Sequence, residues 1–207
     1  MNLSVGFGFQ SGIIETLAKF PEVTEIYGKM HHDIFGGGRW SCTLQQAGYR
    51  DLTKAVKLAH KHRISFNYLL NSADPNGLEQ TIAGQKKIRK FLNFLSSIQI
   101  DSVTVASPYL LRLIKKQYPE FKVRVGAFAQ ISSVDQALKW QDLGADILVI
   151  SAISCNRSFD RLAAIKNSVT CTLELIANAN CLQNCIYEKD HMHLLGYTPA
   201  KNRRVYE

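Results

Sequence analysis

The residues with the clearest potential for chemistry lie near the C-terminal end of the sequence. An apolar run there carries one acidic residue, Glu174, and is followed by two cysteines four positions apart, Cys181 and Cys185. A His-x-His pair, His191 and His193, comes next, so four potential metal ligands fall within 13 residues. Thiolate and imidazole groups are the side chains that hold zinc and iron–sulfur centres. The pattern therefore predicts a metal or cluster site.

A second interpretation of the same residues involves no metal. The spacing differs from that of a zinc finger, whose first ligand pair is usually closer and whose second pair lies further along the chain. Two cysteines in an intracellular protein can also be small buried hydrophobic residues. His191 and His193 would share a face of a strand but not of a helix. From the residues alone, both interpretations remain open.

Length and composition predict one soluble globular domain. The 207 residues, 46% of them hydrophobic, suffice for a sizeable core. The N-terminus lacks the basic and apolar regions of a signal peptide, and no apolar run approaches the ~18 residues of a membrane span. We therefore expect a cytoplasmic protein with no membrane association and reduced cysteines. The odd number of cysteines, five, also argues against a closed set of disulfides.

The charge balance is basic and permits a polyanionic partner. The sequence has 25 basic and 17 acidic residues, for a net charge of +8. Basic residues cluster at positions 86–90, 115–116 and 201–204. Such an excess is compatible with RNA or an anionic small molecule as substrate, although basic runs are more often the solvated faces of helices.

Short apolar runs alternate with amphipathic segments along most of the chain. The expected strands are 3–9, 23–28, 64–70, 102–106, 122–129, 147–150 and 170–177. Strands alternating with helices are typical of parallel βα units. No G-x-G-x-x-G motif follows the first strand, which favours a barrel over a dinucleotide-binding sheet. We predict an α/β fold, a TIM-like (β/α) barrel with about seven βα units and therefore incomplete. Residues 1–195 would form the barrel domain and 196–207 a C-terminal tail.

Polar side chains stand at or after the carboxyl ends of these strands, where barrel enzymes carry their chemistry. We interpret four of them as candidate catalytic residues: His32, Asp33, Glu174 and Asn178. Three others are candidate substrate-binding residues: Arg39, Asn71 and Gln130. Arg39 follows a run of glycines, where backbone can approach a ligand and the guanidinium can bind a carboxylate or phosphate. Asn71 could equally cap a turn.

The sequence resembles the collagenase-like peptidase family U32. The order of elements, the VTEIYG strand, the GGGR loop and the ELIANANCLQNC stretch carry this resemblance over about residues 3–195, as the N-terminal barrel domain of that family. Members often contain a glutamate, an asparagine, Cys-x-x-x-Cys-Pro and a histidine. The matching residues here are Glu174, Asn178, Cys181, Cys185 and His191, with Ile186 in place of the proline.

The resemblance implies particular activities and a cofactor. The family is named for collagenolytic activity, and its better-understood members are similar to oxygen-independent hydroxylases of RNA bases or of a quinone precursor. They use prephenate as the oxygen donor and a four-iron four-sulfur cluster held by four cysteines. By this resemblance, Cys181 and Cys185 would bind the cluster. A zinc site formed by these cysteines and His191 is the alternative.

Three functions follow as hypotheses. The first is an oxygen-independent hydroxylase that acts on RNA bases or an aromatic small molecule and carries an iron–sulfur cluster. The second is a collagenase-like peptidase or metal-dependent hydrolase, although the sequence has neither G-x-S-x-G nor His-Glu-x-x-His. The third is a non-catalytic subunit, because a barrel one unit short exposes strand edges to a partner chain or a second copy.

Overall fold

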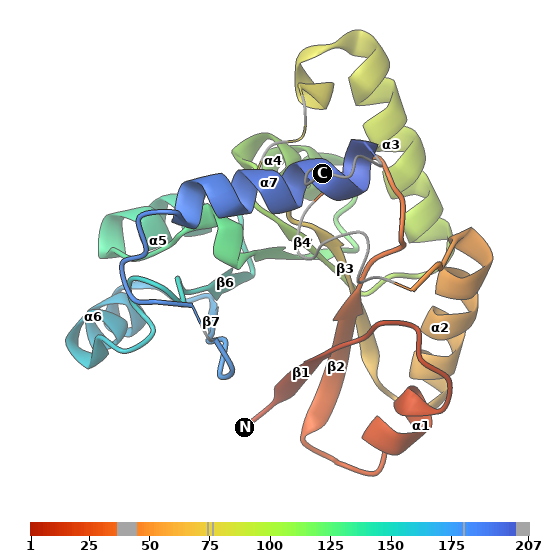
Figure 1. Ribbon diagram of the computed structural model, residues 1–207, viewed down its shortest axis with the longest axis horizontal. Helices are drawn as coiled ribbons and strands as arrows, with labels where there is room; N and C mark the ends of the chain where they lie inside the picture. The colour runs from red at the N-terminus through yellow and green to blue at the C-terminus, as the bar shows by residue number, and fades with distance from the viewer. Residues whose placement is uncertain (37–44, 74, 76, 180, 202–207) are drawn as a thin grey trace.

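The chain forms a single parallel β-sheet whose strands follow one another in sequence order (Figure 1). The computed structural model describes residues 1–36, 45–73, 75, 77–179 and 181–201. The seven strands are β1 (Leu3–Gly6), β2 (Val23–Gly28), β3 (Ser65–Leu70), β4 (Ser102–Val105), β5 (Lys122–Val125), β6 (Ile147–Val149) and β7 (Thr172–Glu174). The predicted incomplete (β/α) barrel is confirmed.

Helices connect consecutive strands, as the alternating pattern predicts. The α-helices are α1 (Ile13–Leu17), α2 (Tyr49–Lys61), α3 (Ile82–Ser97), α4 (Pro108–Gln117), α5 (Val134–Asp142), α6 (Phe159–Ser168) and α7 (Glu188–Lys201). Among the described residues, the 3₁₀ helices η2 (Leu78–Gln80) and η3 (Ala127–Ala129) follow β3 and β5. Helix α7, which begins after the cysteine pair and runs across position 195, was not predicted from the sequence. No described helix has the length and apolar character that a membrane crossing requires.

The outward face of the sheet packs against the helices and forms the core. Successive strand residues point to opposite faces, and the outward set is apolar: Ile26, Phe66 and Leu70 are fully buried. The Tyr68 ring, also buried, lies 5.6 Å from the Phe91 ring of α3. These alternating apolar residues explain why the pattern predicted the strands correctly.

The inward, concave face of the sheet is polar. The inward residues of the central strands include Glu25, Asn67, Thr104 and Arg124, which occupy alternate positions in β2 to β5. Arg124 of β5 forms ion pairs with glutamates of both β2 and β7. One side chain can reach strands so far apart in the sheet order only because the sheet is strongly curved. The ring nevertheless stays open, since no described strand joins edge strand β1 to edge strand β7.

Two aspartates form equivalent contacts at the amino-terminal edge of the sheet. Asp101 lies just before β4. Its Oδ2 accepts a hydrogen bond from the backbone N–H of Phe66, near the start of the neighbouring strand β3, at 2.7 Å and lies 2.8 Å from Nε2 of His60 on α2. Asp146 lies just before β6. Its Oδ2 accepts hydrogen bonds from the backbone N–H of Val123 on β5 at 2.7 Å and from Nζ of Lys115 on α4 at 2.9 Å. Each contact, which we call an aspartate clasp, joins a helix to the two strands that follow it.

Candidate active site

A chain of three charged side chains crosses the concave face of the sheet. Nη2 of Arg124 lies 2.7 Å from Oε1 of Glu25, and its Nε lies 2.9 Å from Oε2 of Glu174. Ser4 and Ser102 each donate a hydrogen bond to Glu25, at 2.6 and 3.0 Å. We call this set the Arg124 cluster. It connects β1, β2, β4, β5 and β7, and the Arg124 side chain is only 6% exposed.

Glu174 is the member of the cluster best placed for chemistry. It ends β7 at the carboxyl edge of the sheet, and its side chain is 28% exposed, whereas that of Glu25 is 13% exposed. Burial raises the pKa of the Glu174 carboxyl above its usual value; Arg124 lowers this pKa and the like charge of Glu25 raises it. The Nε–H of Arg124 is not aligned for a hydrogen bond to Glu174. A partly accessible carboxyl with a raised pKa is a suitable group for proton transfer.

Buried polar atoms without partners lie on the same face. Oγ1 of Thr104 donates to Oδ1 of Asn67 at 2.8 Å and so fixes the Asn67 amide, whose Nδ2 has no hydrogen-bond partner among the described residues. Oδ1 of Asn71, at the end of β3, is likewise buried and unpaired within the described part of the chain. Buried polar groups are normally satisfied, so these atoms mark positions for water or a ligand.

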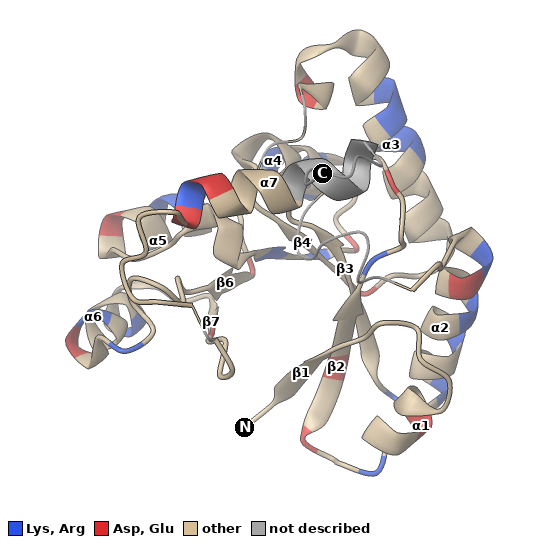
Figure 2. Ribbon diagram, in the orientation of Figure 1, with Lys and Arg blue, Asp and Glu red and all other residues tan. Residues whose placement is uncertain are grey.

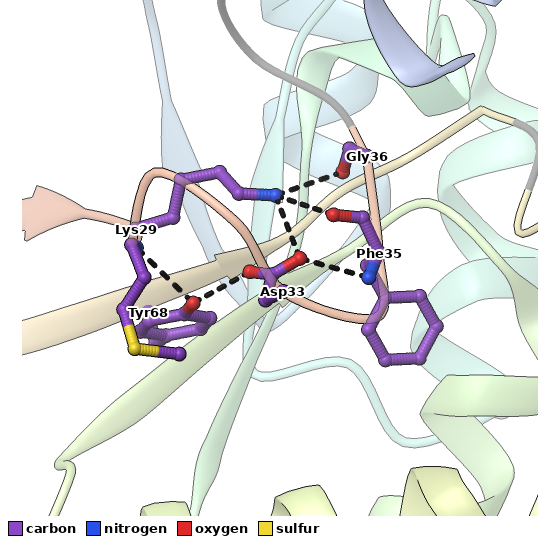
Figure 3. Close-up of polar contacts among 6 residues, drawn as sticks. Lys29, Asp33, Phe35, Gly36 and Tyr68 are labelled. Atoms are coloured by element: carbon purple, nitrogen blue, oxygen red, sulfur yellow. Dashed lines mark hydrogen bonds and ion pairs between the residues drawn. The ribbon is translucent and has the colours of Figure 1, made fainter. Parts of the chain in front are cut away.

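The loop after β2 contains a second buried network, centred on Asp33 (Figure 3). Oδ2 of Asp33 accepts a hydrogen bond from the Tyr68 hydroxyl at 2.5 Å, and Oδ1 accepts from Phe35 N at 2.8 Å. Nζ of Lys29 lies 3.1 Å from Oδ1 and donates to the Phe35 carbonyl at 2.7 Å. The Asp33 side chain is fully buried, so its carboxylate holds the loop in place; a direct role in chemistry stays a prediction.

Burial dominates the electrostatics of this second network. It raises the pKa of Asp33, and the adjacent Lys29 ammonium and the Tyr68 hydrogen bond oppose that rise. It also raises the pKa of Tyr68 well above the usual value, together with the negative charge of Asp33. Tyr68 therefore stays protonated and donates its hydrogen bond throughout the physiological pH range.

The remaining predicted site residues lie at the same edge but do not form one cluster. His32 is exposed and its ring lies 4.1 Å from that of His31. Nε2 of Gln130 lies 3.3 Å from Sδ of Met192, which places α7 beside the end of β5. Asn178 is exposed in the segment after β7. Arg39 lies outside the described residues.

The predicted metal ligands do not converge in the described part of the chain. Cys181 is exposed, Cys185 is half-buried, and neither forms a disulfide. His191 is exposed on the first turns of α7. No group of three or more His, Cys, Asp or Glu side chains that could hold a metal ion occurs among the described residues. The iron–sulfur and zinc roles of Cys181, Cys185 and His191 therefore stay predictions.

A cavity of about 390 Å³ lies at the carboxyl end of β1, beside helices α1 and α2. Its lining is mixed: Phe7 and Leu58 are apolar, whereas Gln10, Glu15 and Lys54 are polar or charged. A volume of this size is within the range of ligand pockets.

The sequence analysis missed the central members of the Arg124 cluster. It identified Glu174 but neither Arg124 nor Glu25, and it also missed Asn67 and Thr104. One signal was available, because Glu25 is the single charged residue of β2 and Arg124 stands between two valines in β5. A charged side chain within a core strand lies inside the protein, and a buried charge requires polar or oppositely charged partners.

The seven parallel strands and their connecting helices define an open (β/α)-barrel protein. Comparison of the sequence with protein families matches residues 34–185 to "Peptidase family U32". The chain belongs to this family, as its resemblance indicated.

Relatives of known sequence or structure agree with this assignment. The chain is 28% identical over 195 residues to "Uncharacterized protease MJ1657" of Methanocaldococcus jannaschii, and the match covers 92% of this chain and 58% of that protein. The chain thus spans little more than half the length of this curated relative. The structure of the U32 peptidase Mk0906 superposes with a TM-score of 0.79 at 19% identity, covering 100% of this chain and 80% of that one.

More distant structures share the fold alone. Oxaloacetate acetylhydrolase in complex with oxalate superposes with a TM-score of 0.55 at 14% identity, over 93% of this chain and 73% of that one. The citrate synthase SbnG superposes with a TM-score of 0.52 at 10% identity, over 86% and 78%.

Proposed function

We propose that the chain is a barrel hydrolase that cleaves peptide bonds, with Glu174 as its acid–base group. The observation that carries the proposal is the partly accessible Glu174 carboxyl, whose pKa is raised by burial and which Arg124 holds at the carboxyl end of β7. The cavity at the end of β1 is compatible with a peptide substrate, because its mixed lining can accept a side chain while its glutamine amides bind backbone. Family membership and the description of the Methanocaldococcus jannaschii relative as a protease favour the same reaction.

The proposed reaction requires only water and the substrate. The ionised Glu174 carboxylate takes a proton from a water molecule whose oxygen bonds to the carbonyl carbon of the peptide. The carbon–nitrogen bond then breaks as Glu174 returns the proton to the leaving nitrogen. A raised pKa makes the Glu174 carboxylate a stronger base than an ordinary glutamate.

We expect Glu174→Gln to lower kcat for cleavage of denatured collagen or an unstructured peptide by about 10²- to 10⁴-fold, the usual contribution of an acid–base group. Because the base is the ionised form, the wild-type rate should rise with pH through the raised pKa of Glu174. Glu22→Gln, at an exposed position before β2, is the matched control and should leave the rate unchanged. No cleavage by the wild type, or equal rates for both variants, would contradict the proposal.

A second candidate function is oxygen-independent hydroxylation of an RNA base or an aromatic molecule with an iron–sulfur cluster. Two observations favour it. The free thiols Cys181 and Cys185 lie on the segment that directly follows Glu174. Basic residues also gather on α2 and α3, which together carry eight basic residues and one acidic residue (Figure 2). Such a surface suits RNA.

Metal analysis separates the two candidates. For the hydroxylase, protein purified without oxygen should contain iron and matching acid-labile sulfide, and both should be lost in the Cys181→Ala/Cys185→Ala variant. Zinc without sulfide in the wild type would indicate the alternative metal site instead. Metal-free protein that cleaves peptides would exclude the hydroxylase candidate and leave the hydrolase.

A further inference from the structure

The cavity at the carboxyl end of β1 is formed where the loop between β1 and α1 meets α2 (Figure 1). The loop supplies Phe7, Phe9 and Gln10, and Gln45 lines the cavity from the segment before α2. The φ angle of Phe9 is 64°, in the left-handed region that a bulky side chain rarely adopts. Backbone strain of this kind gathers at functional sites and ligand clamps. None of the described residues that line the cavity belongs to the Arg124 cluster.

Two glutamine amides of the lining are fixed to the backbone of one residue, Gly8. Oε1 of Gln10 accepts a hydrogen bond from Gly8 N at 3.1 Å. Nε2 of Gln45 donates to the carbonyl oxygens of Gly8 and Phe9 at 3.1 and 3.0 Å, because the opposite orientation would place the amide oxygen against these carbonyls. The nitrogen of Gln10 therefore remains as a donor and the oxygen of Gln45 as an acceptor. A peptide group requires one of each, a donor for its carbonyl and an acceptor for its N–H.

An apolar wall lies beside these amides. The rings of Phe7 and Phe9 have their centroids 4.9 Å apart, and Leu58 of α2 also lines the cavity. Apolar surface next to a donor and an acceptor suits an apolar side chain next to a peptide group. The cavity volume of about 390 Å³ corresponds to a small ligand.

Two lining side chains of opposite charge come from different helices. Glu15 lies on α1 and Lys54 on α2, and both are exposed at the cavity. Neither forms an ion pair with any side chain in the described part of the chain. The third charged lining residue, Asp51, accepts a hydrogen bond from Gly48 N at 2.9 Å and so stabilises the start of α2. A ligand with both an ammonium and a carboxylate group would therefore satisfy both charges.

We propose that this cavity binds short peptides whose two ends are free, with dipeptides as the simplest case. The ligand ammonium pairs with Glu15, its carboxylate pairs with Lys54, and its peptide group lies between the amides of Gln10 and Gln45. The inference rests on the proposed peptidase function and narrows its substrate class to short peptides, since an internal stretch of a long chain presents neither terminal charge.

Calorimetric titration of the full chain tests the proposal, with Glu174→Gln as background so that no probe is hydrolysed. The probes are alanyl-phenylalanine, its N-acetyl form and its C-terminal amide. We expect the free dipeptide to bind about fivefold more tightly than either blocked form, the effect of a favourable exposed ion pair. Glu15→Gln should abolish the effect of acetylation, and Lys54→Gln that of amidation, because each variant removes the charge whose partner the block removes. Glu22→Gln and Lys57→Gln, at exposed positions outside the lining, are the matched controls and should keep both effects.

The outcomes separate this site from the proposed reaction. Equal affinity for the three probes, or effects that survive in both Glu15→Gln and Lys54→Gln, would overturn the site. Binding of free phenylalanine as tightly as the dipeptide would overturn the peptide class, because phenylalanine has no peptide group for Gln10 and Gln45. A dipeptide that binds in the expected pattern but is not hydrolysed by the wild type would overturn the hydrolase and leave the site. Hydrolysis of peptides without preference for free ends would leave the hydrolase and overturn the site.

Discussion

Arg124→Ala should destabilise the protein by about 3–5 kcal/mol, the usual cost of removing one partner from a buried ion pair. Arg124 is 5% exposed and contacts glutamates of β2 and β7. Without it, two carboxylates share a partly buried face with no cation. Each would then bind protons more tightly in the native state than in the unfolded state. The difference from wild type should therefore be smallest in acid and widen as the pH rises to neutral.

Urea unfolding of the variant and of a matched control measures this effect. Lys122 lies two residues before Arg124 on β5, on the same face but exposed to solvent. Lys122→Ala should change the free energy of unfolding by no more than about 0.5 kcal/mol. A similar small effect of Arg124→Ala, or one that is independent of pH, would show that the cluster does not stabilise the curved sheet.

Asp33→Ala should have a comparable effect, about 3–5 kcal/mol, for a related reason. Lys29 and Asp33 have side chains that are 2% and 0% exposed. Removal of the carboxylate leaves the Lys29 ammonium buried with carbonyl partners only. It also leaves the Tyr68 hydroxyl and Phe35 N–H without their acceptor.

Tyr68→Phe provides a graded comparison for this network. It should cost less, about 1–3 kcal/mol, because it removes one hydroxyl and leaves Met30 N–H unsatisfied but keeps the ion pair. Asp142→Ala, at an exposed position on α5, is the control and should stay within about 0.5 kcal/mol of wild type. If Asp33→Ala unfolds at the same urea concentration as this control, the network contributes nothing to stability.

The sequence predicted the strands and the order of the sheet because the apolar face of each strand repeats every second residue. It overestimated strand length where turns begin early. The fifth strand was expected over 122–129, but β5 ends at Val125 and a 3₁₀ helix follows, with Gln130 in the left-handed region at φ 53°. Helix α7 was missed because its apolar residues follow no helical period, and its contact with the sheet edge is a tertiary feature.

The site could be predicted only in part for a similar reason. Glu174 was identifiable because it interrupts an apolar run near the cysteine pair. The partnership of Glu174 with Arg124, and of Arg124 with Glu25, depends on how strongly the sheet curves, since β2 and β7 are not neighbours in the sheet. Curvature is a property of the assembled sheet, and no spacing of residues along the chain reveals it.

The aspartate clasps bear on the order in which the chain folds. The hydrogen bonds of Asp101 close loops of 35 and 41 residues, and those of Asp146 close loops of 23 and 31 residues. Loop closure over a few tens of residues costs little more entropy than a short loop. The segment formed by α2, β3, α3 and β4 can therefore form the Asp101 clasp at its amino-terminal edge before β5 to β7 have been made. During synthesis, the barrel can therefore grow as successive pieces, each joined at its amino-terminal edge before the following strands are made.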